Sequence, residues 1–256
     1  MLASVLASIA FGIIGSYVVV KRIVFISGGI AHTAYGGIGL GFLLGFNPLI
    51  GAMIFAFSAA LIITLMKNKE NQKEDSLIGI MWALGMALGI LFINLKEGYV
   101  PNLMGYLFGN ILTIPREDLF LMVGFDVLIV FIVSYFFDEF QSVTFDEEFA
   151  SVTGLPVRKL NFLLLLLIAL TTVVLIKLVG IILVVALLSI PASISLMFTK
   201  SLKQTMIFSV IVGLIFTIVG LLLSYYLNLV SGATIIMVAV SGYFIARLVF
   251  KIRLTK

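Results

Sequence analysis

Long apolar runs occupy most of the 256-residue chain and leave only short polar segments between them. A helix needs about 20 predominantly apolar residues to cross a hydrocarbon core about 30 Å thick. Charged residues make up 11% of the chain, against roughly 25% in soluble domains. The bilayer must therefore be the main solvent. Nine runs have spanning or near-spanning length: 2–20, 24–46, 48–66, 77–95, 118–137, 160–177, 179–198, 204–226 and 232–250.

These runs predict an all-α polytopic membrane protein. Residues 1–256 form one transmembrane domain, with about eight to nine transmembrane helices and no separate soluble domain. The run 102–114 is too short to cross, and we interpret it as a re-entrant or interfacial segment. The chain has no cysteine, which excludes disulfides and thiolate metal sites.

The positions of basic residues predict the orientation. Lys21 and Arg22 follow the first apolar run, whereas a secretory signal has its basic residues first, so we expect a retained helix. With the N-terminus outside and the C-terminus in the cytoplasm, only Lys96, Arg116 and Lys177 lie outside. This positive-inside bias favours that topology. The basic residues placed inside are Lys21, Arg22, Lys67, Lys69, Lys73, Arg158, Lys159, Lys200, Lys203, Arg247, Lys251, Arg253 and Lys256.

The apolar stretch 160–198 is too long to be one spanning helix. At 1.5 Å per residue it would measure about 58 Å. We predict a break near Lys177 and Gly180, with the returning helix disturbed at Pro191 and Ser189 beside it. Broken helices at membrane depth are tolerated where they face protein or a water-filled cavity. The region is either a pathway lining or a proline-kinked helix in a bundle.

His32 lies about eight residues into the second apolar run, after the glycine pair Gly28 and Gly29. Ionisable residues inside spanning segments usually face the protein interior or a water-filled route. Neutral imidazole is a common metal ligand. We expect the glycines to loosen the helix and expose carbonyls. His32 is either a metal ligand in a translocation path or a histidine satisfied by a neighbouring helix.

Glycine spacings such as that of 37, 41 and 45 also predict close helix packing.

Asp126 is a second ionisable residue within an apolar run. A lone carboxylate in lipid is costly, so it should face inward, pair with another group or be protonated. It could approach His32 and bind a passing cation, or it could make a structural hydrogen bond.

Five carboxylates are concentrated between residues 138 and 148, in a segment that the topology places in the cytoplasm. Phe145, Phe149, Val152 and Leu155 recur at helical spacing, and a stop at Gly154 and Pro156 follows. We predict a short amphipathic helix over 145–157 that docks a soluble protein, because membrane-surface helices are usually basic. Asp138 and Glu139 are interpreted as the solvated end of the preceding helix.

The chain has no nucleotide-binding Gly-x4-Gly-Lys-Ser/Thr loop, and no soluble domain that could hold a nucleophile–base pair, so we expect no enzyme activity. If transport is driven by ATP, hydrolysis occurs on another chain. We expect no nucleic-acid partner.

Several motifs together resemble the membrane permease subunits of metal-ion ABC importers, the zinc, manganese and iron uptake family. The order and spacing of the motifs carry the resemblance over nearly the whole length. The matching segments are 15–22, 36–45, 107–112, 146–150, Gly154, 179–192 and 222–234.

The resemblance implies a fold similar to type II ABC importer permeases in the cell (inner or plasma) membrane. It implies a homodimer, a pair of cytoplasmic ATP-binding subunits, an extracytoplasmic metal-binding protein and a transported divalent ion: zinc, manganese or iron. No permanently bound cofactor is expected. The acidic segment takes the place of the cytoplasmic coupling helix, which puts Asp146, Glu147, Glu148, Phe149, Ala150 and Gly154 at the ATPase-docking surface.

One position departs from the family pattern. Many members have an aspartate one helical turn before the histidine, where this chain has Gly28. Weak coordination by His32, with backbone carbonyls or Asp126, would still suit a path that the ion must leave.

Two other classes of function compete. A secondary cation transporter or channel would use His32 and Asp126 directly, and a non-transporting scaffold would use the acidic segment to recruit a protein. ATPase-independent uptake would favour the first of these.

Overall fold

A computed structural model describes residues 1–66, 74–96, 104–109 and 116–254, and these residues form helices without strands. The predicted inside cluster at residues 67, 69 and 73 lies outside the described residues, as does much of 102–114. The helices are α1 (Leu2–Val20), α2 (Val24–Leu44), α3 (Pro48–Met66), α4 (Glu74–Asn94), α5 (Met104–Phe108), α6 (Arg116–Tyr135), α7 (Phe137–Phe145), α8 (Glu147–Val152), α9 (Val157–Phe198), α10 (Leu202–Leu227) and α11 (Ser231–Leu254).

The all-α polytopic prediction is confirmed. Within the described ranges, seven helical segments are long and apolar enough to span a membrane, and α6 with α7 provides an eighth. These segments include both halves of α9. Helix α2 falls outside this set because its glycines, His32 and Thr33 lower its hydropathy, although most of it is buried within the protein.

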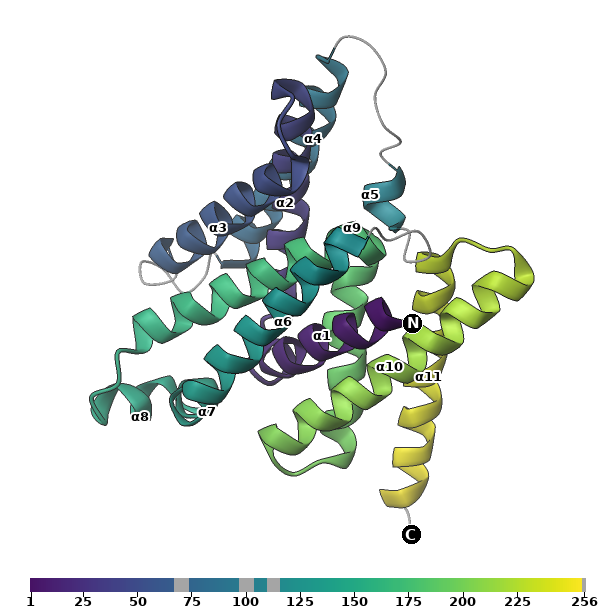
Figure 1. The fold of residues 1–256 in the computed structure, drawn as a ribbon. Coiled ribbons are helices and arrows are strands. Elements are labelled where there is room, and N and C mark those ends of the chain that lie inside the picture. Colours follow the sequence, from purple (N-terminus) through teal and green to yellow (C-terminus); the bar gives the residue numbers. More distant parts are fainter. Residues whose placement is uncertain (67–73, 97–103, 110–115, 255–256) are drawn as a thin grey trace.

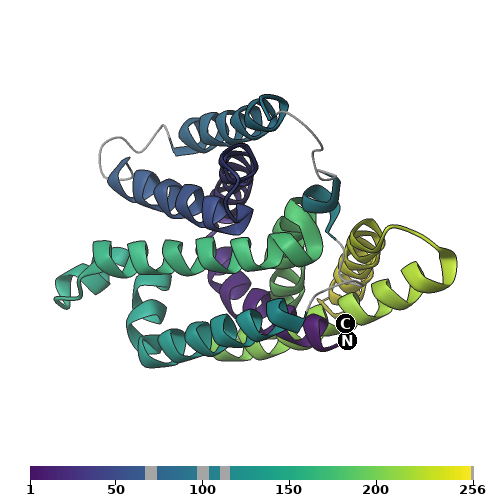
Figure 2. The same cartoon turned by 45° about the horizontal axis from the view of Figure 1, so that its top comes forward.

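Helix α9 is the centre of the fold. It contacts α1, α2 and α3 as well as α10 and α11, and both ribbon views show it between these groups (Figures 1 and 2). Helices α2, α3 and α4 form one group above it in Figure 1, and α10 and α11 form another on the opposite side. Helix α1 packs against both α9 and α10.

Glycines bring α2 into backbone contact with its two neighbours. A Cβ atom on Gly37 would meet the carbonyl of Gly51 on α3, and one on Gly39 would lie 2.8 Å from the Cα atom of Gly89 on α4. The predicted close packing is therefore present. Small residues let helix backbones approach closely in lipid, where van der Waals contact stabilises association.

The long helix α9 breaks at Gly180, within the region where a break was expected. Gly180 has φ 79° and ψ 160°, a conformation that side-chain-bearing residues avoid. The break divides α9 into spans at Val157–Ile176 and Val179–Phe198, which solves the length problem. Pro191 lies within the second half without ending it.

Helices α6 and α7 meet at a bend of 73°. Asp138 and Glu139 lie in the first turn of α7, where carboxylates interact favourably with the helix dipole. The interpretation of these residues as the end of the preceding helix is therefore wrong. Tyr135 is the last residue of α6, and the chain turns before the acidic segment begins.

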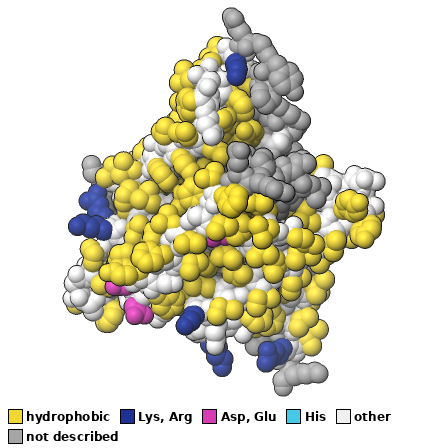
Figure 3. Space-filling view, in the orientation of Figure 1, with side chains coloured by type: hydrophobic (Ala, Val, Ile, Leu, Met, Phe, Trp, Pro, Cys, Tyr) yellow, Lys and Arg dark blue, Asp and Glu magenta, His cyan; other side chains and the backbone are white. Residues whose placement is uncertain are grey.

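The molecular surface carries a broad apolar zone. The face in Figure 3 is mostly hydrophobic, and charged side chains gather mainly towards its lower and left edges. Large apolar side chains such as Phe120, Phe131 and Ile245 are more than half exposed, on α6 and α11. This arrangement fits a bilayer-embedded protein, in which lipid covers apolar surface.

Candidate functional site

His32 is buried between α2 and α4. Its ring stacks on the indole of Trp82, with ring centroids 3.8 Å apart and an interplanar angle of 14°. Its Nδ1 atom lies 3.3 Å from Met86 Sδ. The side chain is 9% exposed. His32 thus lies in a pocket of polarisable groups from α4.

The two glycines before His32 make this packing possible. A Cβ atom on Gly28 would lie 3.2 Å from Trp82 Cζ3, and one on Gly29 would lie 2.7 Å from Ile78 Cγ2. Helix α2 continues through both positions. The expectation that these glycines loosen the helix is therefore wrong, and they instead allow α4 to approach. Trp82 occupies the space beside His32 that a side chain at position 28 would need.

Asp126 is buried on α6, with 6% of its surface exposed. Its Oδ2 atom has no hydrogen-bond partner among the described residues. Helix α6 packs against α1, α9 and α7, whereas His32 contacts α4. The hypothesis that Asp126 approaches His32 receives no support from any described hydrogen bond, ion pair or ring contact of either residue.

The break in α9 is covered by the end of α5. A Cβ atom on Gly109 would lie 2.5 Å from the amide nitrogen of Gly180, and both glycines have positive φ. Beyond the break, Ser189 Oγ donates to the carbonyl of Val185 at 2.8 Å, and the helix continues through Pro191. In this structure Ser189 is thus bonded within its own helix.

The acidic segment forms a corner of two helices. The backbone is extended at Asp146, which ends α7 and caps α8: its Oδ1 accepts a hydrogen bond from the Phe149 amide at 2.9 Å. Gly154, with φ 86°, ends α8 in a Schellman motif in which the Leu155 amide donates to the carbonyl of Ala150. Helix α8 is therefore shorter than the predicted 145–157.

Three apolar side chains project from this corner. Phe145, Phe149 and Val152 are 65%, 61% and 87% exposed. Glu148 is also exposed, whereas Ala150 is fully buried, so the side chain of Ala150 cannot reach a partner. Asp146 and Gly154, two further predicted docking residues, are exposed as well. We call the part of this surface formed by Phe145, Glu148, Phe149 and Val152 the corner surface.

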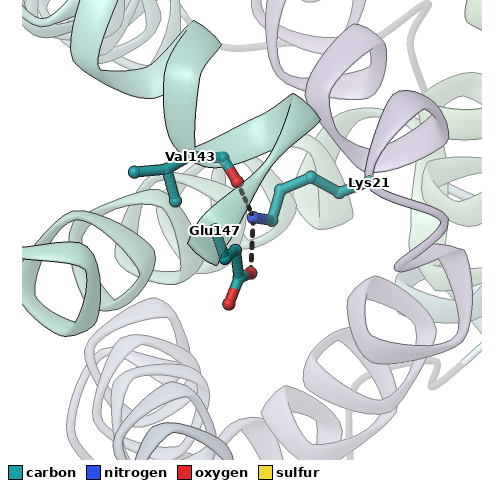
Figure 4. A network of polar contacts seen from close by, with 3 residues as sticks. All are labelled: Lys21, Val143 and Glu147. Atoms are coloured by element: carbon teal, nitrogen blue, oxygen red, sulfur yellow. Dashed lines mark hydrogen bonds and ion pairs between the residues drawn. The ribbon is translucent and has the colours of Figure 1, made fainter. Parts of the chain in front are cut away.

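Lys21 joins the same corner to the turn between α1 and α2 (Figure 4). Its Nζ atom donates to Glu147 Oε1 and to the carbonyl of Val143, each at 2.9 Å. The Lys21 side chain is 6% exposed and that of Glu147 is 38% exposed. The carboxylate of Glu147, predicted as a docking residue, is therefore paired with Lys21, while its side chain stays partly exposed. The pair also joins two segments that the charge bias places on one side of the membrane.

A cavity of about 490 Å³ lies beside this ion pair. It is mostly apolar, with Ile26, Ile63 and Leu164 in its wall and Arg158 and Lys159 among its charged lining. It lies where the beginning of α2, the end of α3 and the beginning of α9 meet.

Sequence reasoning missed Trp82, Met86 and Lys21 as partners. Lys21 is 126 residues from Glu147, and Met86 is 54 residues from His32. No local pattern reports such contacts. The sequence marks Trp82 only as the single tryptophan of the chain, within the apolar run 77–95.

Comparisons with known proteins agree over nearly the full length. The profile of the ABC 3 transport family matches residues 1–250. An uncharacterized membrane protein of Synechocystis is 49% identical over 96% of this chain and 88% of its own. The manganese transport system membrane protein MntC of Listeria innocua is 35% identical, with the same coverage of both chains.

A solved structure of PsaBC from Streptococcus pneumoniae, in complex with a Fab, has the same fold. Its TM-score is 0.86 at 32% identity, covering 96% of this chain and 88% of that chain.

Proposed function

Because the chain belongs to the ABC 3 transport family, we propose that it is the membrane permease subunit of an ATP-driven importer of divalent metal ions. The family consists of metal transporter permeases, and the chain is a multi-pass membrane protein. The observation that carries the proposal is the similarity in sequence and fold over almost the whole chain.

Manganese is the first candidate for the transported ion, and zinc is the second. A relative of 35% identity is named as a manganese transport protein, which supports manganese. The imidazole of His32 suits zinc and iron as well. In this proposal His32 contacts the ion in transit, and weak binding there favours release. Asp126 is the second candidate ligand, because its buried Oδ2 lacks a partner among the described residues.

We further propose that two copies of the chain form the pore, with the C-termini in the cytoplasm. A pair of ATP-binding subunits would dock on the corner surface, and an extracytoplasmic metal-binding protein would deliver the ion. Exposed aromatic and aliphatic side chains beside a carboxylate suit a protein partner, since anionic lipid would repel Glu148.

Uptake of radioactive manganese and zinc into vesicles tests the function. The permease reconstituted with its ATPase should accumulate metal only with ATP, and His32→Ala should lower the rate while leaving assembly intact. Uptake that persists without any ATPase would instead establish a secondary transporter or channel.

Co-purification tests the docking surface. Glu148→Arg combined with Phe149→Ala should abolish retention of the ATPase, because the pair removes an exposed ring and reverses an exposed charge. Phe120→Ala is the matched control, since Phe120 is 77% exposed near the start of α6, at the end of that helix opposite to α7. Equal ATPase recovery in both variants would contradict the assignment.

A further inference from the structure

One buried lysine contacts both helices at the corner between α7 and α8. Lys21 Nζ contacts a carbonyl in the last turn of α7, that of Val143, and a carboxylate in the first turn of α8, that of Glu147. One cation therefore stabilises the C-terminal end of one helix and an acidic residue at the start of the next. Figure 4 shows the carbonyl of Val143 and the carboxylate of Glu147 converging on the nitrogen of Lys21.

The turn that carries Lys21 is stiff. Its residues separate α1 from α2, and their amides are bonded back to α1: Arg22 N–H donates to Val19 at 3.0 Å, and Ile23 N–H donates to Val18 at 2.9 Å. Arg22 has φ 59°, a left-handed conformation that is uncommon outside glycine. Such a conformation persists where surrounding contacts fix it. This short, hydrogen-bonded turn therefore links the backbone of Lys21 to the end of α1 and to the start of α2.

Helix α2 connects this turn to His32. It begins at Val24 and continues without interruption to Leu44. His32 is eight residues beyond Val24, a distance of about 12 Å along the helix axis. On α2, His32 stacks on the indole ring of Trp82, which lies on α4.

A second contact limits independent motion of α7. The rings of Tyr17 on α1 and Phe140 on α7 pack edge to face, with centroids 5.7 Å apart, and both are buried. The base of the corner thus packs on α1 through a ring contact, and Glu147 at its tip contacts the α1–α2 turn through its ion pair with Lys21. The ion pair is thus a direct contact between α8 and the α1–α2 turn.

We propose that Lys21 is a positioning residue that couples the corner surface to α2. The inference rests on the proposed function. When a docked ATPase moves α8, the Lys21–Glu147 pair transmits the movement to the start of α2 and so to His32. The covalent connection from α8 through residues 153–156 into α9 is the competing route, and it does not require Lys21.

The decisive measurement is the amount of metal transported per ATP hydrolysed, in proteoliposomes that contain the permease and its ATPase. Lys21→Gln should still bind the ATPase and sustain ATP hydrolysis, but transport per ATP should fall roughly tenfold, the size expected when a hydrogen bond to a charged group is lost. In Glu147→Gln, transport per ATP should fall by a similar factor. Lys21→Arg keeps a donor for both acceptors and should retain most of the coupling.

Lys200→Gln is the matched control, because Lys200 is an exposed lysine in the turn between α9 and α10. Hydrogen exchange gives a second measurement: ATPase docking should alter exchange at residues 23–30 in the wild type and not in Lys21→Gln. An unchanged transport ratio in Lys21→Gln, with wild-type exchange, would overturn the proposal. Absence of ATP-driven uptake in the wild type would instead refute the proposed function.

Discussion

Gly37 and Gly79 offer a test of how closely the α2 group is packed. A Cβ atom on Gly37 would meet the Gly51 carbonyl and would lie 2.8 Å from the amide nitrogen of Ala52. These are backbone atoms, so no side-chain rotation can relieve the contact. A Cβ atom on Gly79 of α4 would have no described heavy atom within 4 Å. The same substitution to alanine should therefore have opposite effects at the two positions.

The magnitudes follow from two opposing terms. Alanine is more favourable than glycine inside a helix by about 0.5–1 kcal/mol. Overpacking a close contact costs about 1–3 kcal/mol, and a backbone contact belongs at the upper end. Gly37→Ala should then destabilise the protein by about 2 kcal/mol, and Gly79→Ala should stabilise it by about 0.5–1 kcal/mol. At about 2–4 °C per kcal/mol, the two Tm values should differ by about 5–12 °C.

Thermal unfolding of the purified variants in one detergent would measure this difference, with the wild type between them. Equal Tm values for Gly37→Ala and the wild type would refute the reasoning, because they would show that α2 and α3 can separate without loss. A low Tm for Gly79→Ala would show that its surface packs against something outside the chain.

Three further outcomes are expected. Gly180→Ala should lower stability by about 1–2 kcal/mol, since φ 79° strains an alanine; an unchanged unfolding curve would mean that the break relaxes. Fluorescence of Trp82, the single tryptophan, should change when manganese is added, and His32→Ala should abolish the response; a response that survives would place the metal elsewhere. Asp126→Asn should raise Tm slightly, because its buried Oδ2 lacks a described partner; a lower Tm would reveal one, such as a second copy of the chain.

The length of the apolar runs identified the membrane helices, because the thickness of the bilayer sets how many apolar residues a spanning helix needs. The break at Gly180 followed from the same argument, since one helix over 160–198 would be too long for a membrane. The stop at Gly154 was also a local signal, because glycine is favoured at positive φ. These features depend on residues close together in the chain.

Contacts between distant segments could not be predicted in this way. Glu147 was predicted on the docking surface with its neighbours, and its ion pair with Lys21, 126 residues away in the chain, was not foreseen. Ala150 was included in the same surface and is buried. Helical spacing assigns residues to faces but does not say which face packs. Likewise, Gly28 and Gly29 were interpreted as loosening α2, because the sequence could not show that Trp82 and Ile78 fill the space beside them.

The glycine contacts of α2 also act as a seal. A Cβ atom on Gly85 of α4 would lie 2.5 Å from the Cα atom of Thr33, and Gly39 faces Gly89 in the same manner. Where two backbones touch, no side chain can swing aside to open a crevice, and a hydrated ion finds no entrance. At these contacts, the packed backbones of α2 and α4 leave no room for water or an ion between the two helices. In the proposed importer, an ion would therefore have to reach the protein interior beside these contacts and not through them.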